Sequence, residues 1–388
     1  GSGQAPALSP EQSTPSITAD ASQRPIEDGQ ERAKQVLEGA GAAVPPTAVP
    51  SPRRIPSHLQ PAGFSFSNRR VTTGQSSLDH AWEPGDHQRF RLRVGPNYKK
   101  YGRKEPSGPV LLELLEVDLF KSSALVHNLG EFIALPEPRV PVPEGSAVPP
   151  IFVVHGSLPF EAPSMLGNSN GPTLNAVFYF GLREETQQAL ASLETAPKAV
   201  QLLETFCRSA HADPSVFNRF KCIGMLRNYE EVGMPSIMKG YNGKPVLIRN
   251  RSAVKGGSGV MDQQQDSIIM HVNVRLWPLL ARTGLHTLFG ASAKCDLDVG
   301  FTIEGRADDE LPEVLLGAVH IAHLRLDELP QWPPPIGGGG AKLSHQEGSQ
   351  RGGGAVPGRG RRVDGDGRGG STATTGISDQ PSPSSSHR

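Results

Sequence analysis

Several stretches of this chain alternate between apolar and polar side chains, and this alternation limits the possible folds more than any other feature. It is clearest in the runs 90–94, 268–276 and 297–303. Successive side chains of a β-strand point to opposite faces, so a period of two predicts strands with one buried face and one solvated face. A fourth run, 319–326, changes face midway and therefore predicts a β-bulge.

Shorter apolar runs and a few helical patterns complete the predicted elements. The runs 151–154, 176–180 and 245–248 predict strands that are more deeply buried. A helical pattern is present only over 183–208 and, more weakly, over 279–294. Because several predicted strands follow one another without an intervening helix, the sequence favours an α+β fold with a mainly antiparallel β-sheet core and a few helices.

Glycine and proline gather toward the two ends of the chain and delimit the folded part. The sequence has 44 Gly and 36 Pro among 388 residues, about a fifth of the chain, where an ordinary protein has about an eighth. Residues 1–85 are rich in Pro, Ser and Ala, and residues 331–388 are rich in Gly, Arg and Ser, so both segments are predicted to be disordered. The predicted domain therefore covers 86–330.

Charge and cysteine content exclude several classes of protein. The chain has 39 Lys and Arg against 39 Asp and Glu, which excludes a wholly basic nucleic-acid-binding protein. Short Arg-Gly-Gly tracts in the tail resemble RNA-binding segments but lack stacking aromatics, so nucleic acid is not an expected partner. The three cysteines lie far apart, which predicts no disulfide framework, no zinc site and a reducing, cytoplasmic compartment.

The apolar content also argues against a membrane span. The longest apolar stretch, 276–291, is interrupted by Pro278, Arg282 and His286 and falls short of a transmembrane segment. The chain starts with Gly-Ser-Gly and no initiator Met, so we expect it to be part of a longer protein. No cofactor motif is present, and none is predicted.

Eight sequence blocks, taken in order, resemble the C-terminal domain of the plant enhanced disease resistance two family. The first block, 90–98, reads Phe-Arg-Leu-Arg-Val-Gly-Pro-Asn-Tyr and is followed by a cluster of lysines and arginines. The other seven blocks are 114–122, 176–180, 243–248, 301–305, 309–313, 316–319 and 323–326. Together the blocks cover nearly the whole predicted domain.

This resemblance implies a non-catalytic regulatory domain that acts at membranes. Larger members of the family carry pleckstrin-homology and START-like lipid-binding domains ahead of this one. The chain departs from the family pattern in two places: Val94 stands where the family usually has Arg before the Gly-Pro pair, and 275–279 replaces a Gly/Ser-rich turn. The companion domains are not seen in this chain, so a START-type lipid cavity is not carried over.

The strongest candidate site is a basic segment with no acidic residue between positions 89 and 104. Its seven cations are Arg89, Arg91, Arg93, Lys99, Lys100, Arg103 and Lys104. Three of them share one strand face, and the Gly95-Pro96 turn is expected to bring the lysines close to that face. Each basic residue near an anionic membrane surface contributes about 1 kcal/mol. We therefore predict that Arg91, Arg93, Lys99, Lys100, Arg103 and Lys104 bind anionic lipid headgroups of the phosphoinositide type, with Gly95 and Pro96 shaping the turn.

Other interpretations of these patterns remain open at this point. The basic strand is also typical of a charged edge that stays soluble, or of a scaffold that docks an acidic protein partner. Asp296, Asp298 and Glu304 share a strand face and would serve a hydrolase if they lined a pocket, but alternation alone predicts them on a solvated face. His320 and His323 are expected on opposite faces of a strand, where they cannot share a metal ion. The sequence thus predicts no catalytic residue and no metal site, in a cytoplasmic protein that associates peripherally with endomembranes or the plasma membrane.

Overall fold

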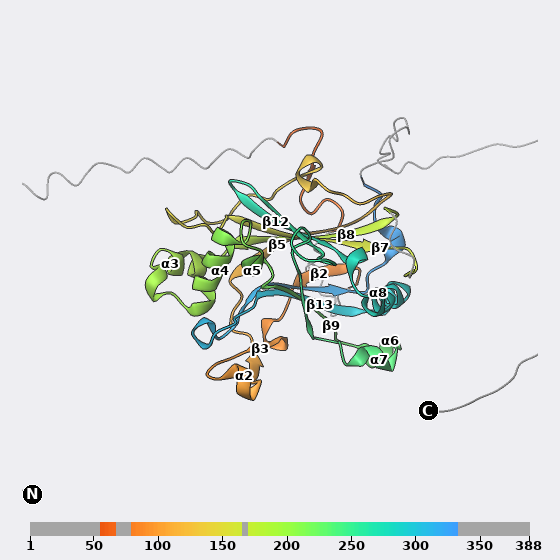
Figure 1. Ribbon diagram of the computed structural model, residues 1–388. Coiled ribbons are helices and arrows are strands. Elements are labelled where there is room, and N and C mark those ends of the chain that lie inside the picture. The colour runs from red at the N-terminus through yellow and green to blue at the C-terminus, as the bar shows by residue number, and fades with distance from the viewer. Residues whose placement is uncertain (1–54, 67–78, 165–169, 333–388) are drawn as a thin grey trace, which may run out of the picture. The chain divides into compact units, whose positions relative to one another are not determined.

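Two five-stranded sheets face each other and enclose the main core (Figure 1). The computed structural model describes residues 55–66, 79–164 and 170–332. The first sheet, here the β8 sheet, has the order β11 (Gly259–Gln263), β12 (Ser267–Asn273), β7 (Ile151–Pro159), β8 (Thr173–Leu182) and β5 (Leu112–Ser122). The second, the β13 sheet, has the order β10 (Pro245–Leu247), β9 (Phe220–Leu226), β13 (Asp296–Ile303), β14 (Leu315–Ala322) and β2 (Ala81–Pro84).

Within these two sheets the pairing is antiparallel, except that β12 runs parallel to β7. In that parallel pair Ser267 lies opposite Ile151 and Asn273 lies opposite Ser157. Together with the helices, this arrangement confirms the predicted α+β fold with a mainly antiparallel core.

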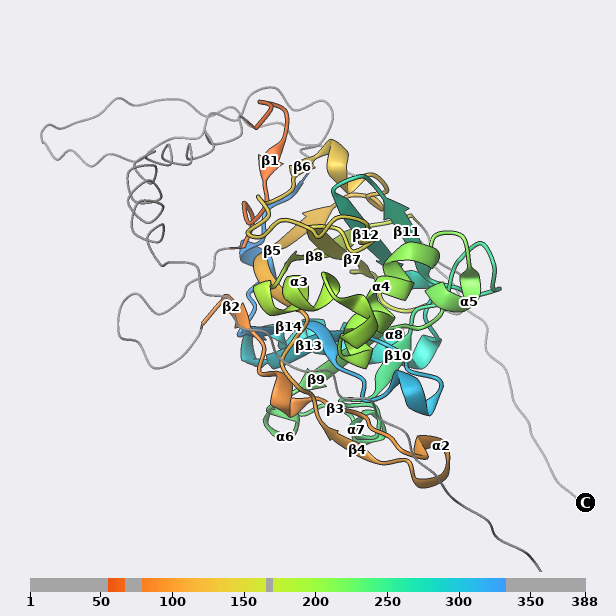
Figure 2. The same cartoon turned by 90° about the vertical axis from the view of Figure 1, so that its left-hand side faces the viewer.

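A short two-stranded ribbon covers the outer face of each sheet (Figure 2). The pair β1 (Gln60–Pro61) and β6 (Ile133–Ala134) lies over the β8 sheet, where Ile133 packs with Ile151 and Val153. The pair β3 (Arg91–Arg93) and β4 (Lys104–Pro106) lies under the β13 sheet and is joined by α2 (Tyr98–Tyr101). The central strands of each sheet are therefore covered on both faces, whereas the edge strands β10 and β11 keep exposed side chains.

Helices close the two ends of the space between the sheets (Figure 1). One end carries α3 (Glu184–Leu190), α4 (Lys198–Ser209) and α5 (Pro214–Phe217), and the opposite end carries α6 (Tyr229–Val232), α7 (Ser236–Lys239) and α8 (Leu279–Ala291). Short 3-10 turns are η1 (His87–Arg89), η2 (Leu129–Glu131), η3 (Leu193–Thr195), η4 (Val274–Leu276), η5 (Ser292–Lys294), η6 (Asp308–Glu310) and η7 (Leu326–Glu328). Among the described residues, no helix is long and apolar enough to span a bilayer.

Aromatic rings fill the interior at the α4 end. The ring of Phe220 lies 6.0 Å from those of Phe206 and Phe301, in stacked arrangements. Phe152 and Phe178 extend this cluster toward the β8 sheet. Offset aromatic pairs of this kind add about 1 kcal/mol each beyond the area they bury. The α4 end is therefore the tightly packed part of the core.

The structure corrects several expectations from the sequence. The domain begins before the predicted boundary at 86, because residues 55–66 and β2 belong to the fold and contribute the buried side chains of Phe66 and Trp82. Of the strands predicted to be half-buried, β3 does keep an exposed face, whereas β12 and β13 are largely covered on both faces. The run 319–326 has no bulge: β14 ends at Ala322, and the register shift lies in the pairing of β13 between Phe301 and Thr302. The predicted tail also starts within the fold, because Gln331 bridges to Lys121 and Trp332 packs with Phe64. The remaining parts of the predicted disordered flanks, 1–54, 67–78 and 333–388, fall outside the described residues.

Candidate functional site

The predicted basic segment forms a ribbon, β3-α2-β4, that is anchored on the outer face of the β13 sheet. Phe90 and Leu92 point inward, as their alternation predicted, and pack against Ile223, Leu315 and Ala318. The backbone carbonyl of Phe90 accepts a 2.8 Å hydrogen bond from the amide of Ser107, which ties the return strand to the first strand. The ribbon is thus fixed by apolar burial on one face and by backbone pairing along its length.

Two of the arginines that alternate with Phe90 and Leu92 form ion pairs with carboxylates of the β13 sheet. Arg89 Nε lies 3.1 Å from Asp298, whose carboxylate also receives two hydrogen bonds from Arg227. Arg93 Nη1 lies 2.9 Å from Glu304 Oε1. The side chain of Asp298 is fully buried and that of Glu304 nearly so, which makes the predicted solvated carboxylate face wrong. Alternation placed these carboxylates on the correct side of the strand, but could not show that the ribbon covers that side.

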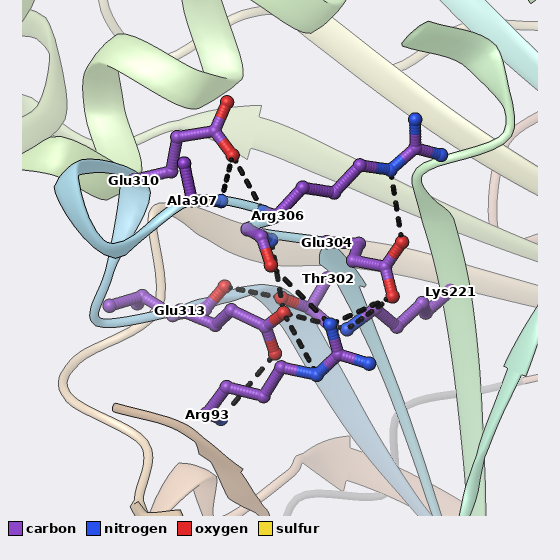
Figure 3. Close-up of polar contacts among 10 residues, drawn as sticks. Arg93, Lys221, Thr302, Glu304, Arg306, Ala307, Glu310 and Glu313 are labelled. Atoms are coloured by element: carbon purple, nitrogen blue, oxygen red, sulfur yellow. Dashed lines mark hydrogen bonds and ion pairs between the residues drawn. The ribbon is translucent and has the colours of Figure 1, made fainter. Parts of the chain in front are cut away.

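Arg93 belongs to a buried cluster of charges with Lys221, Glu304 and Glu313 (Figure 3). The ammonium of Lys221 lies 2.7 Å from Glu313 Oε1, and the two side chains are 2% and 1% exposed. Burial lowers the pKa of Lys221, while the negative charge of Glu313 acts in the opposite direction. Glu313 also accepts a 3.0 Å hydrogen bond from the amide of Gly305. Each charge of the cluster has a partner of opposite sign. The cluster therefore links β9, β13, the segment before β14 and the ribbon.

The remaining cations of the ribbon lie on α2, on the turn after it, and on β3 and β4, where Arg91 is opposite Pro106 and Lys104 is half-buried. Within the described part of the chain, four of them form no ion pair: Arg91, Lys99, Lys100 and Lys104. Arg103 is paired with Glu105. Tyr101 is 65% exposed and lies under the ammonium of Lys100, at 5.1 Å from ring centroid to nitrogen. We call these four cations and Tyr101 the ribbon tip.

The turn before α2 is held by an acidic residue. Asn97 has a left-handed backbone conformation, with φ of 60°, directly after the Gly95–Pro96 pair. The carboxylate of Asp308 accepts a 2.7 Å hydrogen bond from the Asn97 amide and a longer one from the Tyr98 amide. Gly95 and Pro96 thus lie where the sequence predicted a turn, and Asp308 fixes the direction in which α2 leaves it.

The six residues predicted to bind headgroups therefore lie on one ribbon but in different environments. Arg93 is held in the buried charge cluster and stacks on the ring of Tyr98 at 4.9 Å, so its charge is already compensated within the protein although its side chain is 27% exposed. The guanidinium of Arg91 donates a 2.7 Å hydrogen bond to the carbonyl of Lys104 and is otherwise exposed. The exposed cations are thus fewer than the sequence indicated.

The two histidines of the His-x-x-His motif approach the same carboxylate. His320 Nε2 lies 3.5 Å and His323 Nε2 lies 3.9 Å from Asp296 Oδ1. They were expected on opposite faces of one strand, but β14 ends at Ala322 and His323 adopts φ of 49°, which turns its ring back. Among the described residues, no group of three or more His, Cys, Asp or Glu side chains is arranged to hold a metal ion.

A cavity of about 340 Å³ lies between the sheets at the α8 end, and the sequence did not predict it. Its walls are apolar side chains of β7, β8, β9, β12 and β13, and it is bordered by α7 and α8. One signal was present in the sequence: Gly224 stands inside a strand, where glycine is uncommon unless something approaches the backbone closely. Among the described residues, the cavity and the ribbon tip are two candidate ligand sites.

Comparison with known families identifies the blocks described above. The family model described as "Protein ENHANCED DISEASE RESISTANCE 2, C-terminal" matches residues 82–325, which is more than half of the chain. Its first matched residue lies in β2 and its last lies just after β14, so the match covers both sheets. No curated protein and no solved structure matches the chain.

Proposed function

This chain belongs to the family of Enhanced Disease Resistance 2 C-terminal domains, and from that premise we propose that it is a non-enzymatic regulatory domain that associates with anionic membrane lipids through the ribbon tip. The observation that supports this proposal is the group of four cations without ion pairs beside an exposed tyrosine. Tyrosine is enriched at membrane interfaces, where its ring lies at headgroup level. The proposed setting is the cytoplasmic surface of endomembranes or of the plasma membrane.

The magnitude of the charge effect fits peripheral and reversible binding. Each cation close to an anionic surface contributes about 1 kcal/mol, so four cations supply about 4 kcal/mol. That amount corresponds to roughly a thousandfold change in partitioning and is screened by salt within a Debye length of about 8 Å. Phosphoinositide-type headgroups carry several negative charges in a small area and are the proposed preferred target.

Sedimentation of the full chain with vesicles tests the proposal. We expect pelleting with phosphoinositide-containing vesicles, little pelleting with neutral phosphatidylcholine vesicles, and a steady loss as salt is raised. The double variant Lys99→Glu, Lys100→Glu removes about 2 kcal/mol and adds repulsion, so its affinity should fall at least about thirtyfold. The matched control Arg251→Glu, Lys255→Glu changes the same charge on the exposed loop between β10 and β11 and should leave pelleting nearly unchanged.

Equal pelleting with neutral and anionic vesicles would rule out headgroup binding. If the full chain binds no vesicle but retains an acidic protein in a pull-down that the Lys99→Glu, Lys100→Glu variant loses, the ribbon tip is instead the docking surface of a protein scaffold.

A further inference from the structure

The cavity at the α8 end has an apolar interior and one cation at its mouth. Among the described residues that line it, Lys244 is the only one charged at neutral pH. The Lys244 ammonium lies 5.8 Å from the ring centroid of Tyr241 and forms no ion pair within the described ranges. An unpaired cation beside an apolar space is the pattern expected for a ligand with an anionic head and an aliphatic body.

The polar groups in the wall are largely occupied by the protein itself. The amide of Asn242 bonds to both the amide and the carbonyl of Leu226. The hydroxyl of Tyr229 donates to the carbonyl of Pro235 at 2.6 Å, and the indole N–H of Trp277 donates to Ser258. Buried water needs several polar partners, whereas apolar cavities stay dry and accept apolar ligands. The interior is therefore suited to an aliphatic chain rather than to ordered water.

A missing side chain at Gly224 helps to create the space, whereas the place of a Cβ at Gly284 is filled by the side chain of Met238. Gly156, Gly224 and Gly284 all line the cavity. At Gly224 no heavy atom lies within 4 Å of the position that a Cβ would occupy, although this residue stands in the middle of β9. The tightly packed α4 end has phenylalanines on the same two sheets, so the hollow is local to the α8 end.

Exposed apolar side chains are common on the elements that border the cavity. They lie on α7, on the turn after it, on β10 and at the start of α8, and they are Ile237, Tyr241, Val246, Leu247, Leu279 and Leu280. Tyr241 and Val246 also line the cavity. Six of the nine large hydrophobic residues that are exposed in the described part of the chain thus gather on elements that border the cavity. Tyr241 and Val246 thus place exposed apolar surface at the cavity itself.

We propose that this cavity binds a single medium-chain fatty acid, with its aliphatic chain between the sheets and its carboxylate at Lys244. A methylene group occupies about the volume of a water molecule, about 30 Å³, so 340 Å³ accommodates about a dozen carbons. That is one chain and not the two chains of a membrane phospholipid. The site goes beyond headgroup contact at the ribbon tip and does not depend on it.

A chain-length series tests the fit to the cavity. Calorimetric titration of the full chain with octanoate, decanoate, dodecanoate, tetradecanoate and hexadecanoate, each below its micelle concentration, should show affinity rising about fourfold per methylene. The rise should level off at about a dozen carbons. Failure of dodecanoate to bind would overturn the proposal, and so would an affinity that keeps rising through hexadecanoate, because simple partitioning onto a surface has no length limit.

Two variants test the residues. Gly224→Ile places a branched side chain, well suited to a strand, into the open space and should lower dodecanoate affinity at least about tenfold. Lys244→Gln should lower dodecanoate affinity about two- to fivefold and leave dodecanol affinity unchanged. The control Lys198→Gln, at the α4 end, should change neither. Equal losses for dodecanoate and dodecanol in Lys244→Gln would contradict the assigned role of the lysine.

A variant that weakens binding at one lipid site should leave binding at the other site unchanged. Gly224→Ile should still pellet with phosphoinositide-containing vesicles, and the Lys99→Glu, Lys100→Glu variant should still bind dodecanoate. If Gly224→Ile does not fold, the chain-length limit of the unmodified protein still decides the question.

Discussion

The outer faces of the two sheets bury polar side chains by opposite means. Under the ribbon, the β13 sheet pairs full charges, with Lys221 against Glu313 and Arg227 against Asp298. Over the β8 sheet the polar groups are mainly hydrogen-bonded and uncharged, and His155 and His271 face each other with their Nδ1 atoms 2.9 Å apart. A buried ion pair is sensitive to the loss of either partner, whereas a buried neutral group is sensitive to gaining a charge. The two faces should therefore respond to different perturbations.

Removing a partner from the charged face should have the largest effect. Glu313→Gln leaves the ammonium of Lys221 buried, with only Glu304, at 4.0 Å, to compensate. We expect the free energy of unfolding to fall by about 3 kcal/mol, at the low end of the range for broken buried pairs because Glu304 remains. Urea denaturation measures this loss. Adding Lys221→Met to the same variant should recover part of it, and strictly additive losses would show that the pair is not coupled.

Acidification should destabilise the outer face of the β8 sheet, where the buried polar groups are mainly uncharged. Burial is the main cause that lowers the pKa of His155 to about 3 and that of His271 to about 4, with repulsion from neighbouring histidines adding to it. Because the folded pKa lies below the unfolded value of about 6.5, the unfolded state binds more protons, and stability falls as the pH drops below 6.5. For His155 the loss between pH 7 and pH 5 is about 2 kcal/mol.

The measurement is the free energy of unfolding as a function of pH. The double variant His155→Gln, His271→Gln removes both titrating rings and should flatten the curve between pH 7 and pH 5. Glu313→Gln, which changes the other face, should shift the curve without flattening it. Parallel curves for the double histidine variant and the unmodified protein would show that these rings are not the acid-sensitive groups.

A smaller effect is expected where a carboxyl holds the outer segment of the β8 sheet. Asp118 accepts hydrogen bonds from the Gly63 amide, from Ser65 and from the hydroxyl of Tyr179, and burial raises its pKa. Asp118→Asn replaces one acceptor with a donor that faces other donors, which costs about 1.5 kcal/mol. Amide hydrogen exchange should rise in residues 60–66 and stay unchanged in β9 and β13. Equal increases in both sheets would mean that the domain opens as one unit instead.

The smallest effect should come from an ion pair on the surface. Arg103 and Glu105 lie on the exposed ribbon with side chains 62% and 46% exposed. Solvent and salt screen such pairs, so Arg103→Ala should change the free energy of unfolding by at most about 0.5 kcal/mol. A loss in the free energy of unfolding as large as that of Glu313→Gln would show that the contribution of an ion pair to stability does not depend on its burial here.

The sequence was informative wherever one residue pattern determines one local structure. Alternation correctly placed Phe90 and Leu92 inward and assigned Asp298 and Glu304 to the opposite side of their strand. It could not show that Arg89 and Arg93 would meet those carboxylates, because the partners lie about 200 residues apart in the chain. Contacts between such distant segments depend on sheet order, which alternation does not encode.

The cavity between the sheets could not be predicted from the sequence, for a related reason. A cavity depends on how side chains from separate elements fill the space between them, and the lining of this one comes from β7, β8, β9, β12, β13 and α8. Only the placement of Gly224 inside a strand hinted at it. Lys244 was recognisable as a loop lysine, but its place at the mouth of the cavity follows from the pairing of β9 with β10.

The position of β14 has a consequence for how this domain is made. The strand lies between β13 and β2, and its register places Val319 opposite Pro84 and Ala322 opposite Ala81. β2, the first strand of this sheet along the chain, therefore cannot pair until β14, the last one, has left the ribosome. Such distant pairing slows folding and leaves sheet edges open during synthesis. We expect nascent chains that stop before residue 315 to depend on chaperones, and the family's domain to tolerate neither an early stop codon nor separation into two halves.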